Sequence, residues 1–443
     1  MKPIRLYTNA TRSVILVLCL MVTGSWLHPQ PRPQPEKPGI TLDEHSTLQD
    51  FLDTAERNNP GLQAAYDQWQ AALAQVPQVR ALPNPQLTYT YYLRQVETRV
   101  GPQYHKIGIM QMFPWFGKLG LKGNAAQDVA NAEKQKYESL KLNLSYRVKE
   151  AYYEYYYIGR TTAILRENLQ LLEHLESVIR EKYRTGTAPF TGLVKIQVEL
   201  DKLKDQLTGV NDMLVPLKAR LNTVMNRPPS DPLPLPEALP ETSTTPEPSQ
   251  LSFEELAAKL KQNNPGLKSL DAMISKEQTG IRLAKKNSLP DFSLGVDYII
   301  TGDARMPGVM DSSKDPVMVM LSLQLPIWSK KNRASVNEAT ARYRAAVNQE
   351  QETENSLLSQ LEMILYNYRD ARRKIVLYRD SLLPKAQQAL EVTRSAFETG
   401  KADFLDFIDS QRTLLAFSLA YEEAKTREAQ RLAELEMIIG EKL

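Results

Sequence analysis

FETGKADFLDFIDSQ, residues 397–411, predicts a helix, a tight turn and a second helix. Gly400 suits the left-handed backbone conformation that commonly ends a helix, because glycine has no side chain to clash there. Asp403 follows at a position where its carboxylate can accept hydrogen bonds from the free N–H groups of the next helix. The chain is therefore expected to reverse its direction here.

Two acidic residues follow this turn. Asp406 and Asp409 are three residues apart, so a helix places both carboxylates on one face, beside Leu405 and Ile408. Acidic residues next to an apolar seam often form only a solvated face. From this stretch alone, a solvated face and a functional pair of carboxylates both remain open.

The turn has a counterpart in the first half of the chain, where YRTG at 183–186 corresponds to FETG at 397–400. Other short motifs recur in the same order and at nearly constant spacing: NNPGL at 58–62 and 263–267, LP at 82–83 and 289–290, and FP at 113–114 with LP at 325–326. Such self-similarity is typical of one structural unit present twice. We therefore expect two internal repeats.

Composition divides the chain into five segments. Residues 1–25 contain basic residues, an apolar run and then small residues, which is typical of a secretory signal peptide. A Pro-rich leader is expected over 26–45, repeat 1 over 46–226, a Pro-, Ser- and Thr-rich linker over 227–250, and repeat 2 over 251–443. Cys19 raises the question of a lipid anchor, but Leu18 precedes it where a lipid-attachment site favours a small residue.

Each repeat is predicted to run helix, helix, strand, loop, strand and then two long helices. In repeat 1 we expect short helices over about 48–57 and 62–76, strands over about 84–95 and 104–113, and long helices over about 118–183 and 189–226. In repeat 2 we expect short helices from Phe253 and Leu267, strands over about 290–300 and 316–325, and long helices over about 332–398 and 403–440.

The predicted strands are apolar on one side only. That side carries Leu87, Tyr89, Tyr91 and Leu93 in the first strand and Val317, Val319, Leu321 and Leu323 in the last. Four strands by themselves leave two open edges and an uncovered apolar face. Closure by several chains into a membrane barrel, with lipid outside and water inside, would remove both problems.

The predicted long helices are too long for a globular domain. The segment 118–183 contains no strong helix breaker, and at 1.5 Å per residue it would span roughly 100 Å. After Gly186, apolar residues keep spacings of three and four, which predicts a coiled coil. This seam comprises Leu193, Ile196, Leu200, Leu203, Leu207, Val210, Leu214, Leu217, Leu221 and Val224. Pro216 and Pro384 are expected to bend or break their helices.

The sequence shows no catalytic constellation, and neither an enzyme nor a cofactor is expected. The net charge of +3 does not favour nucleic acid as a partner. Cys19 is the only cysteine, and the histidines are not spaced as metal ligands. Thioethers suit soft ions such as Cu(I), but methionine more often fills irregular apolar space, and packing is the favoured interpretation. The methionines at strand spacing are Met110, Met112, Met318 and Met320.

Taken together, these features resemble the TolC-like outer-membrane efflux family. The resemblance covers residues 46–443 and rests on the duplicated NPGL segments, the strand exits FPWFGK (113–118) and LPIWSK (325–330), the two TG turns and LDFIDSQ (405–411). It implies a mainly helical fold whose long antiparallel coiled-coil hairpins form a periplasmic α-barrel. It also implies that four strands per chain complete a trimeric twelve-stranded β-barrel.

The resemblance further implies the exit duct of a tripartite system in the outer membrane of a Gram-negative bacterium. A homotrimer would passively conduct small molecules or ions received from a periplasmic adaptor and an inner-membrane pump, with lipid around its barrel. The implied adaptor-docking tips are Tyr183, Thr185, Gly186, Phe397, Thr399 and Gly400. Asp406 and Asp409 correspond to the family's periplasmic gate, where each would form a ring of three. When the tip glycines are aligned, Lys195 takes the place of Asp409 and becomes a candidate counter-charge.

Two other functions remain open from sequence. A duct for polypeptide secretion, of the type I kind, shares the architecture and differs only in its partner pump. An exported coiled-coil scaffold would use the same helices without forming a pore. The cargo is also open, although the FPWFGK exit is similar to that of members paired with metal-exporting pumps, among others.

Overall fold

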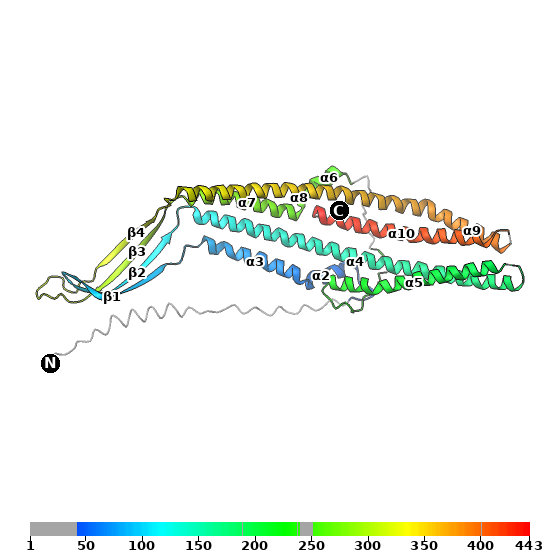
Figure 1. Cartoon of the computed structure of the whole chain (residues 1–443), viewed down its shortest axis with the longest axis horizontal. Helices are drawn as coiled ribbons and strands as arrows, with labels where there is room; N and C mark the ends of the chain where they lie inside the picture. Colours follow the sequence, from blue (N-terminus) through cyan, green and yellow to red (C-terminus); the bar gives the residue numbers. More distant parts are fainter. Residues whose placement is uncertain (1–41, 188, 237, 240–250, 400) are drawn as a thin grey trace, which may run out of the picture. The chain divides into compact units, whose positions relative to one another are not determined.

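The structure is a computed structural model, which describes residues 42–187, 189–236, 238–239, 251–399 and 401–443. The expected signal peptide, Cys19, most of the Pro-rich leader and Gly400 lie outside these residues. The described part of the chain is mainly helical with four antiparallel strands, which confirms the predicted fold class (Figure 1).

The first half contains α2 (Leu48–Asn58), α3 (Pro60–Arg80), β1 (Gln86–Thr98), β2 (Gly101–Phe113), α4 (Lys118–Arg184) and α5 (Phe190–Val224). The second half contains α6 (Phe253–Asn263), α7 (Pro265–Lys286), β3 (Asp291–Thr301), β4 (Val317–Gln324), α8 (Ser329–Leu377), the π-helical turn η2 (Tyr378–Leu382), α9 (Leu383–Glu398) and α10 (Phe404–Ile439). The strand β1 therefore begins and ends later than the strand expected over 84–95. The strand β2 begins earlier than the strand expected over 104–113 and ends at the same residue.

The two NNPGL motifs separate pairs of helices in the same way. The side chains of Asn59 and Asn264 accept hydrogen bonds from the N–H groups of Leu62 and Leu267, at 2.9 and 3.0 Å. In each case proline occupies the first helical position, where its missing N–H costs nothing. The second helix of each pair thus begins at the proline, two residues before the expected leucine, and α3 continues beyond the expected end at 76.

The four strands form one sheet in the order β1-β2-β3-β4. The two hairpins, far apart in sequence, meet where β2 pairs with β3, with Ile107 opposite Tyr298 and Ile109 opposite Val296. One side, called the apolar face, carries Leu87, Tyr89, Tyr91, Ile107, Ile109, Leu294, Val296, Tyr298, Val317, Val319, Leu321 and Leu323. The other side, called the mixed face, carries Thr88, Lys106, Gly108, Met110, Met112, Ser293, Gly295, Asp297, Met318, Met320 and Ser322.

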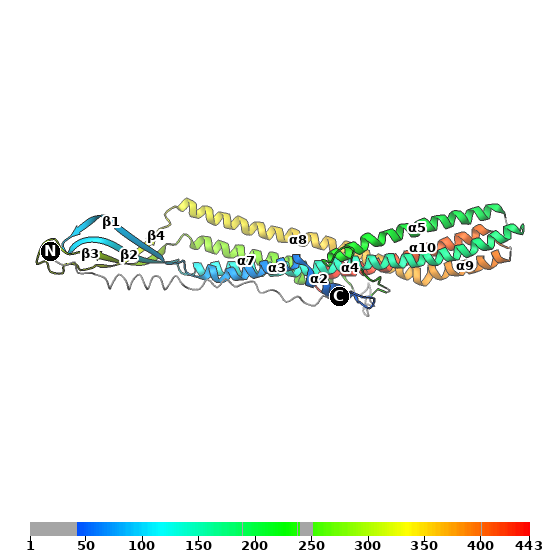
Figure 2. The same cartoon turned by 90° about the horizontal axis from the view of Figure 1, so that it is seen from below.

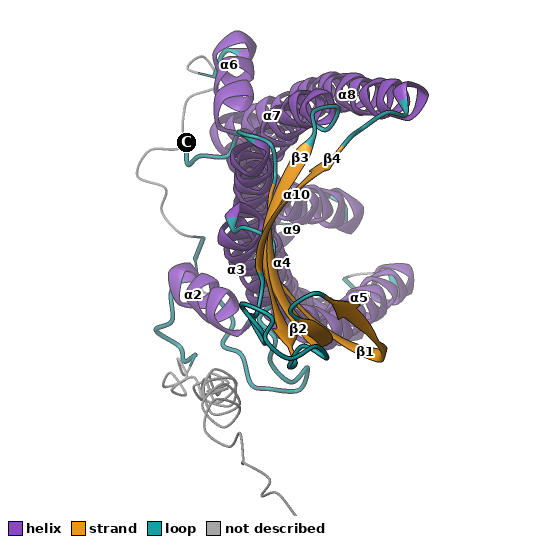
Figure 3. Cartoon of the chain, turned by 90° about the vertical axis from the view of Figure 1, so that its left-hand side faces the viewer, coloured by secondary structure: helices purple, strands orange, loops and turns teal. Residues whose placement is uncertain are grey.

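The sheet curves toward its mixed face. Gly108, Gly295 and Asp297 at the centre of this face are buried, whereas Leu294 and Val296 on the apolar face are exposed. In the described part of the chain, no helix packs along the sheet, so this difference reflects the curvature that Figure 3 shows. The edges of β1 and β4 remain unpaired within the described residues.

A buried lysine links the sheet to the helices. Lys118, the first residue of α4, donates through Nζ to Asp291 Oδ1 at 2.7 Å and to the Leu289 carbonyl at 2.9 Å. The Trp115 N–H donates to the same Asp291 oxygen at 2.7 Å. The exit of β2 and the entry to β3 are thereby joined, which gives the lysine of the FPWFGK motif a structural role.

Long helices make up most of the rest. The helix α4 has 67 residues, about 100 Å at 1.5 Å per residue, and runs beside α3, α5, α7 and α10 (Figures 1 and 2). The irregularity expected near Pro384 is present, because α8 gives way to η2 and Pro384 is the second residue of α9. The break expected at Pro216 is absent: α5 runs unbroken, and the Asp212 carbonyl that loses its N–H partner belongs to an exposed residue.

Three apolar clusters hold the helices together. One surrounds Phe51, Tyr152 and Leu221, a second surrounds Leu260, Tyr368 and Leu435, and a third near the helical turns contains Ile196, Phe397 and Phe407. The tyrosines of α4 thus serve as core residues, and burial raises the pKa of Tyr152, Tyr153 and Tyr155.

Among the residues that the structure describes, every helix lacks the length of apolar sequence that a membrane crossing requires.

Candidate functional site

The first candidate site is the turn between α4 and α5. Gly186 has φ of 72°, a left-handed conformation that favours glycine. The Thr185 hydroxyl donates to the Glu181 carbonyl at 3.1 Å, which closes the end of α4. The rings of Tyr183 and Phe190 are in contact across the turn, tilted by 47° with centroids 5.5 Å apart, and both side chains are exposed. This turn therefore presents an aromatic pair to its surroundings.

The second turn, between α9 and α10, presents less apolar surface. The Thr399 hydroxyl donates to the Ser395 carbonyl at 3.0 Å, and Asp403 caps α10 by accepting from the Phe404 N–H at 2.6 Å. Phe397 is only 9% exposed because it packs against Phe404 and Phe407, whereas its counterpart Tyr183 is 44% exposed. The two equivalent aromatic residues thus have different roles.

The two turns lie at the end of the helical part away from the strands (Figures 1 and 2). Lys182 joins them: its Nζ donates to the Phe397 carbonyl at 3.2 Å and lies 4.4 Å from the centre of the Phe397 ring. This combination of a hydrogen bond and a cation–π contact fixes the end of α4 to the end of α9.

The acidic residues of α10 face away from the core. Asp406 and Asp409 are exposed, with the Asp409 side chain at 76%, while Phe407 and Ile408 between them are buried. The helix therefore places both carboxylates on one solvent-facing side.

Arg412 holds Asp409 within a group of four charged residues. Arg412 contacts Asp409 Oδ1 at 3.4 Å through Nη1 and binds both carboxylate oxygens of Glu199 on α5, with Nε to Oε2 at 3.1 Å. Lys202 Nζ lies 3.2 Å from the same carboxylate. We call Glu199, Lys202, Asp409 and Arg412 the charged clasp.

The charged clasp joins α5 directly to α10. Arg412 and, more weakly, Lys202 hold the pKa of Glu199 below its usual range, and Glu199 in turn raises the pKa of Arg412. Next to it, the buried Gln411 donates to Asn168 Oδ1 of α4 at 2.9 Å. A cavity of about 310 Å³ lies beneath the clasp, lined by Leu172, Leu203, Ile408 and Leu415 among others.

Lys195, the predicted counter-charge, is not part of the charged clasp. It is exposed, and among the described residues no ion pair joins it to Asp406 or Asp409. Gly192, which takes the place of Asp406 in the first repeat, lies against Phe404, whose ring would be 3.9 Å from a Cβ added there. Glu199 and Arg412 were not predicted from the sequence. The one feature that could have indicated the Arg412–Asp409 pair is their spacing of three residues on a helix.

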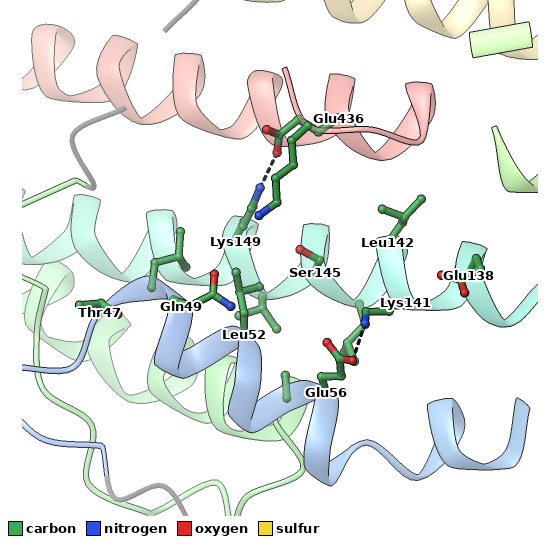
Figure 4. A pocket seen from close by; sticks show the side chains of 15 residues that line it. Thr47, Gln49, Leu52, Glu56, Glu138, Lys141, Leu142, Ser145, Lys149 and Glu436 are labelled. Atoms are coloured by element: carbon green, nitrogen blue, oxygen red, sulfur yellow. Dashed lines mark hydrogen bonds and ion pairs between the residues drawn. The ribbon is translucent and has the colours of Figure 1, made fainter. Parts of the chain in front are cut away.

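A larger cavity of about 600 Å³ lies between α2, α4 and the end of α10. Leu52 and Leu142 contribute to its apolar lining, and the ion pairs Lys141–Glu56 and Lys149–Glu436 cross it (Figure 4). These side chains connect the three helices and offer no nucleophile paired with a base. In the described ranges, no group of three or more His, Cys, Asp or Glu residues is placed to hold a metal ion.

Comparison with known proteins identifies the class of protein. The family described as outer membrane efflux protein matches residues 51–227 and 256–441, and the chain belongs to this family. It is an outer-membrane exit duct, as the sequence predicted, and its family consists of channel proteins rather than enzymes.

Individual relatives are distant but cover nearly the whole chain. The cobalt-zinc-cadmium resistance protein CzcC of Cupriavidus metallidurans is 20% identical over 394 residues, which are 89% of this chain and 90% of that protein. The structure of CusC has a TM-score of 0.74 at 16% identity and covers 89% of this chain and 92% of its own. The outer membrane protein VceC from Vibrio cholerae has a TM-score of 0.71 at 16% identity, covering 89% and 96%. These structures share the fold.

Proposed function

We propose that three copies of this chain form one passive duct. The observation that carries this proposal is the curved sheet with unpaired edges at β1 and β4 and an exposed apolar face. Pairing β4 of one chain with β1 of the next would satisfy both edges, and a closed ring would place the apolar faces against lipid. The mixed faces would then line a water-filled barrel, and the long helices would continue it into the periplasm.

We also propose that the halves of the chain arose as two repeats, over 46–226 and 251–443, with signal, leader and linker segments as predicted. The same order of short helices, strands and long helices on both sides of the linker supports this division.

The family and the exposed turns support two partners, an inner-membrane pump and a periplasmic adaptor. A duct without an energy source needs a pump, and a periplasmic adaptor would connect the two. The exposed Tyr183 and Phe190 pair supports docking of the adaptor at the α4–α5 turn, since exposed aromatic side chains are favoured at protein interfaces. CzcC is named for resistance to cobalt, zinc and cadmium, which favours a metal ion among the cargo classes.

The gate would be held by charge. In a trimer, Asp406 and Asp409 would each form a ring of three, and like charges near an axis repel. The charged clasp supports a closed state in which Arg412 offsets part of this repulsion and holds α10 against α5. Opening would separate α10 from α5 at this position. Lys195 would assist only if a neighbouring chain brings it close.

Bilayer recording and membrane fractionation test the proposal. Purified protein should run as a trimer, form pores in a planar lipid bilayer and stay with outer membranes during carbonate extraction. A monomeric protein that forms no pores would overturn it. An exported scaffold would instead be released by carbonate, and a secretion duct would conduct but require a polypeptide-exporting pump in cells.

A further inference from the structure

Four methionines lie on the mixed face of the sheet, where a water-filled barrel would be expected to carry polar residues. In the register, Met110 of β2 faces Gly295 of β3, and Gly295 faces Met320 of β4. Two long thioether side chains therefore flank a residue that has none. Met318 lies next to Met320 on the same face, and Met112 lies next to Met110.

Gly295 leaves the space that these side chains need. A Cβ at this position would lie 3.6 Å from Met110 Cγ, so the Met110 side chain already lies beside the empty position. Methionine has three rotatable side-chain bonds, which allow its sulfur to reach over a neighbouring glycine. Met110 and Met320 are thus neighbours across Gly295, and Met318 lies two residues before Met320 on the same face.

The packing role that the sequence favoured does not account for this cluster. Met318 and Met320 are 42% and 37% exposed, and no helix among the described residues covers the mixed face. The apolar face, on the other side of the sheet, carries the large aliphatic and aromatic side chains. The methionines thus stand on an open concave surface rather than in a core.

The charges beside the cluster favour a soft cation over a hard one. Asp297, opposite Met318, is buried and pairs with Lys106 at 2.6 Å. Because Lys106 compensates this carboxylate, the site offers no free oxygen anion for ions such as Mg²⁺ or Ca²⁺. The thioether sulfurs remain as donors, and they select soft monovalent ions such as Cu(I).

We propose that Met110, Met318 and Met320 form a binding site for soft monovalent cations, namely Cu(I) and its chemical analogue Ag(I). The site rests on the proposed function, because it takes the mixed face as the wall of the duct. It would provide a transient contact for such ions inside the strand-built part of the passage, with Met112 beside it.

Silver nitrate in chloride-free buffer tests the site on the purified full-length protein. Equilibrium dialysis should detect Ag(I) binding that the variant M110L/M318L/M320L weakens at least tenfold. The matched control is M306L/M310L, since these two methionines lie in the β3–β4 loop at 75% and 83% exposure. Leucine keeps a similar volume, so both variants are expected to fold, and unchanged potassium nitrate conductance in a bilayer verifies this.

The possible outcomes distinguish failure of the proposed binding site from failure of the proposed duct. Micromolar Ag(I) should reduce the conductance of the wild type and of M306L/M310L but not of M110L/M318L/M320L. If Ag(I) did not change the conductance and all three proteins bound Ag(I) equally, the proposed binding site would be wrong, while the proposed duct would still stand. Absence of pores would overturn the duct, while dialysis would still decide whether the methionines bind Ag(I).

Discussion

Arg412 connects Asp409 of α10 to α5. It contacts Asp409 on its own helix and Glu199 on α5, so one side chain joins an exposed carboxylate to the contact between two long helices. Exposed ion pairs contribute only about 0.2–1 kcal/mol to folding stability. The clasp therefore matters for the position of α10 more than for the stability of the protein.

Replacing Arg412 with alanine should open the duct. We expect Arg412→Ala to raise the single-channel conductance or the open fraction several-fold in a planar bilayer, because α10 loses its link to α5. The melting temperature should change little. Arg394→Ala is the matched control, since Arg394 forms an exposed pair with Glu391 three residues earlier on α9. Equal conductance of both variants and wild type would count against a role for the clasp.

Acid should release the same contact. Arg412 depresses the pKa of Glu199, so the pair stabilises the closed state fully above the ordinary carboxyl pKa of about 4.3 and loses this effect as the pH falls through the depressed value. We expect conductance to rise on acidification below about pH 4. Glu199→Gln should conduct more at neutral pH and lose this part of the pH response. A wild-type response identical to that of Glu199→Gln would show that Glu199 is not the group responsible for the pH dependence.

At the scale of elements, the apolar seam of α5 holds this helix against its neighbours along its length. Every apolar position of the predicted heptad on α5 is buried or partly buried, and Ile196 lies fully inside the cluster near the turns. The exposed valines between these positions face away from α4. The spacing of three and four along the sequence thus translates into one continuous buried stripe.

Truncating this seam should weaken the tip region. Ile196→Ala removes a fully buried side chain and should cost about 2–5 kcal/mol, seen as a lower melting temperature and as faster proteolysis near the turns. Val215→Ala on the same helix removes an exposed side chain and should have little effect. Matching melting curves for the two variants would show that the seam is not packed as described.

At the scale of the whole molecule, the curvature of the sheet determines which of its two faces is concave. The apolar and mixed faces could be assigned from alternation, but alternation does not say which face is concave. Burial of Gly108, Gly295 and Asp297 decides this, since side chains on the inner side of a curved sheet crowd together. The apolar residues are therefore on the convex side, which would face lipid in the proposed barrel.

A charge on the outward face should therefore prevent membrane assembly. Val319→Arg places a guanidinium where lipid is expected, at a cost of about 2–4 kcal/mol near the membrane centre. We expect less protein in the outer-membrane fraction and fewer trimers on native gels. Ser322→Arg lies on the mixed face of the same strand and should assemble normally. If both variants assembled equally well, lipid contact on the apolar face would be excluded.

Local patterns sufficed to predict the helices, the strands and the turn chemistry. Asp403 acts on the residue next to it, so its capping role could be predicted from the sequence. The caps at Asn59 and Asn264 are equally local but were not predicted. The family followed from the order of such motifs. Pro216 was expected to bend or break its helix, and α5 is unbroken there; the carbonyl that loses its N–H partner belongs to the exposed residue Asp212, where solvent can replace the bond.

The sequence by itself determined a chain of long coiled-coil helices with half-apolar strands, because periods of two and of about three and a half appear directly in the order of residues. Only the tertiary structure decided that Arg412 links Asp409 to Glu199 of α5, and that Met110 and Met320 flank Gly295. Glu199 and Arg412 are 213 residues apart, and β2 and β3 belong to different halves of the chain. Contacts between such distant residues depend on helix rotation and strand register, which no local pattern specifies.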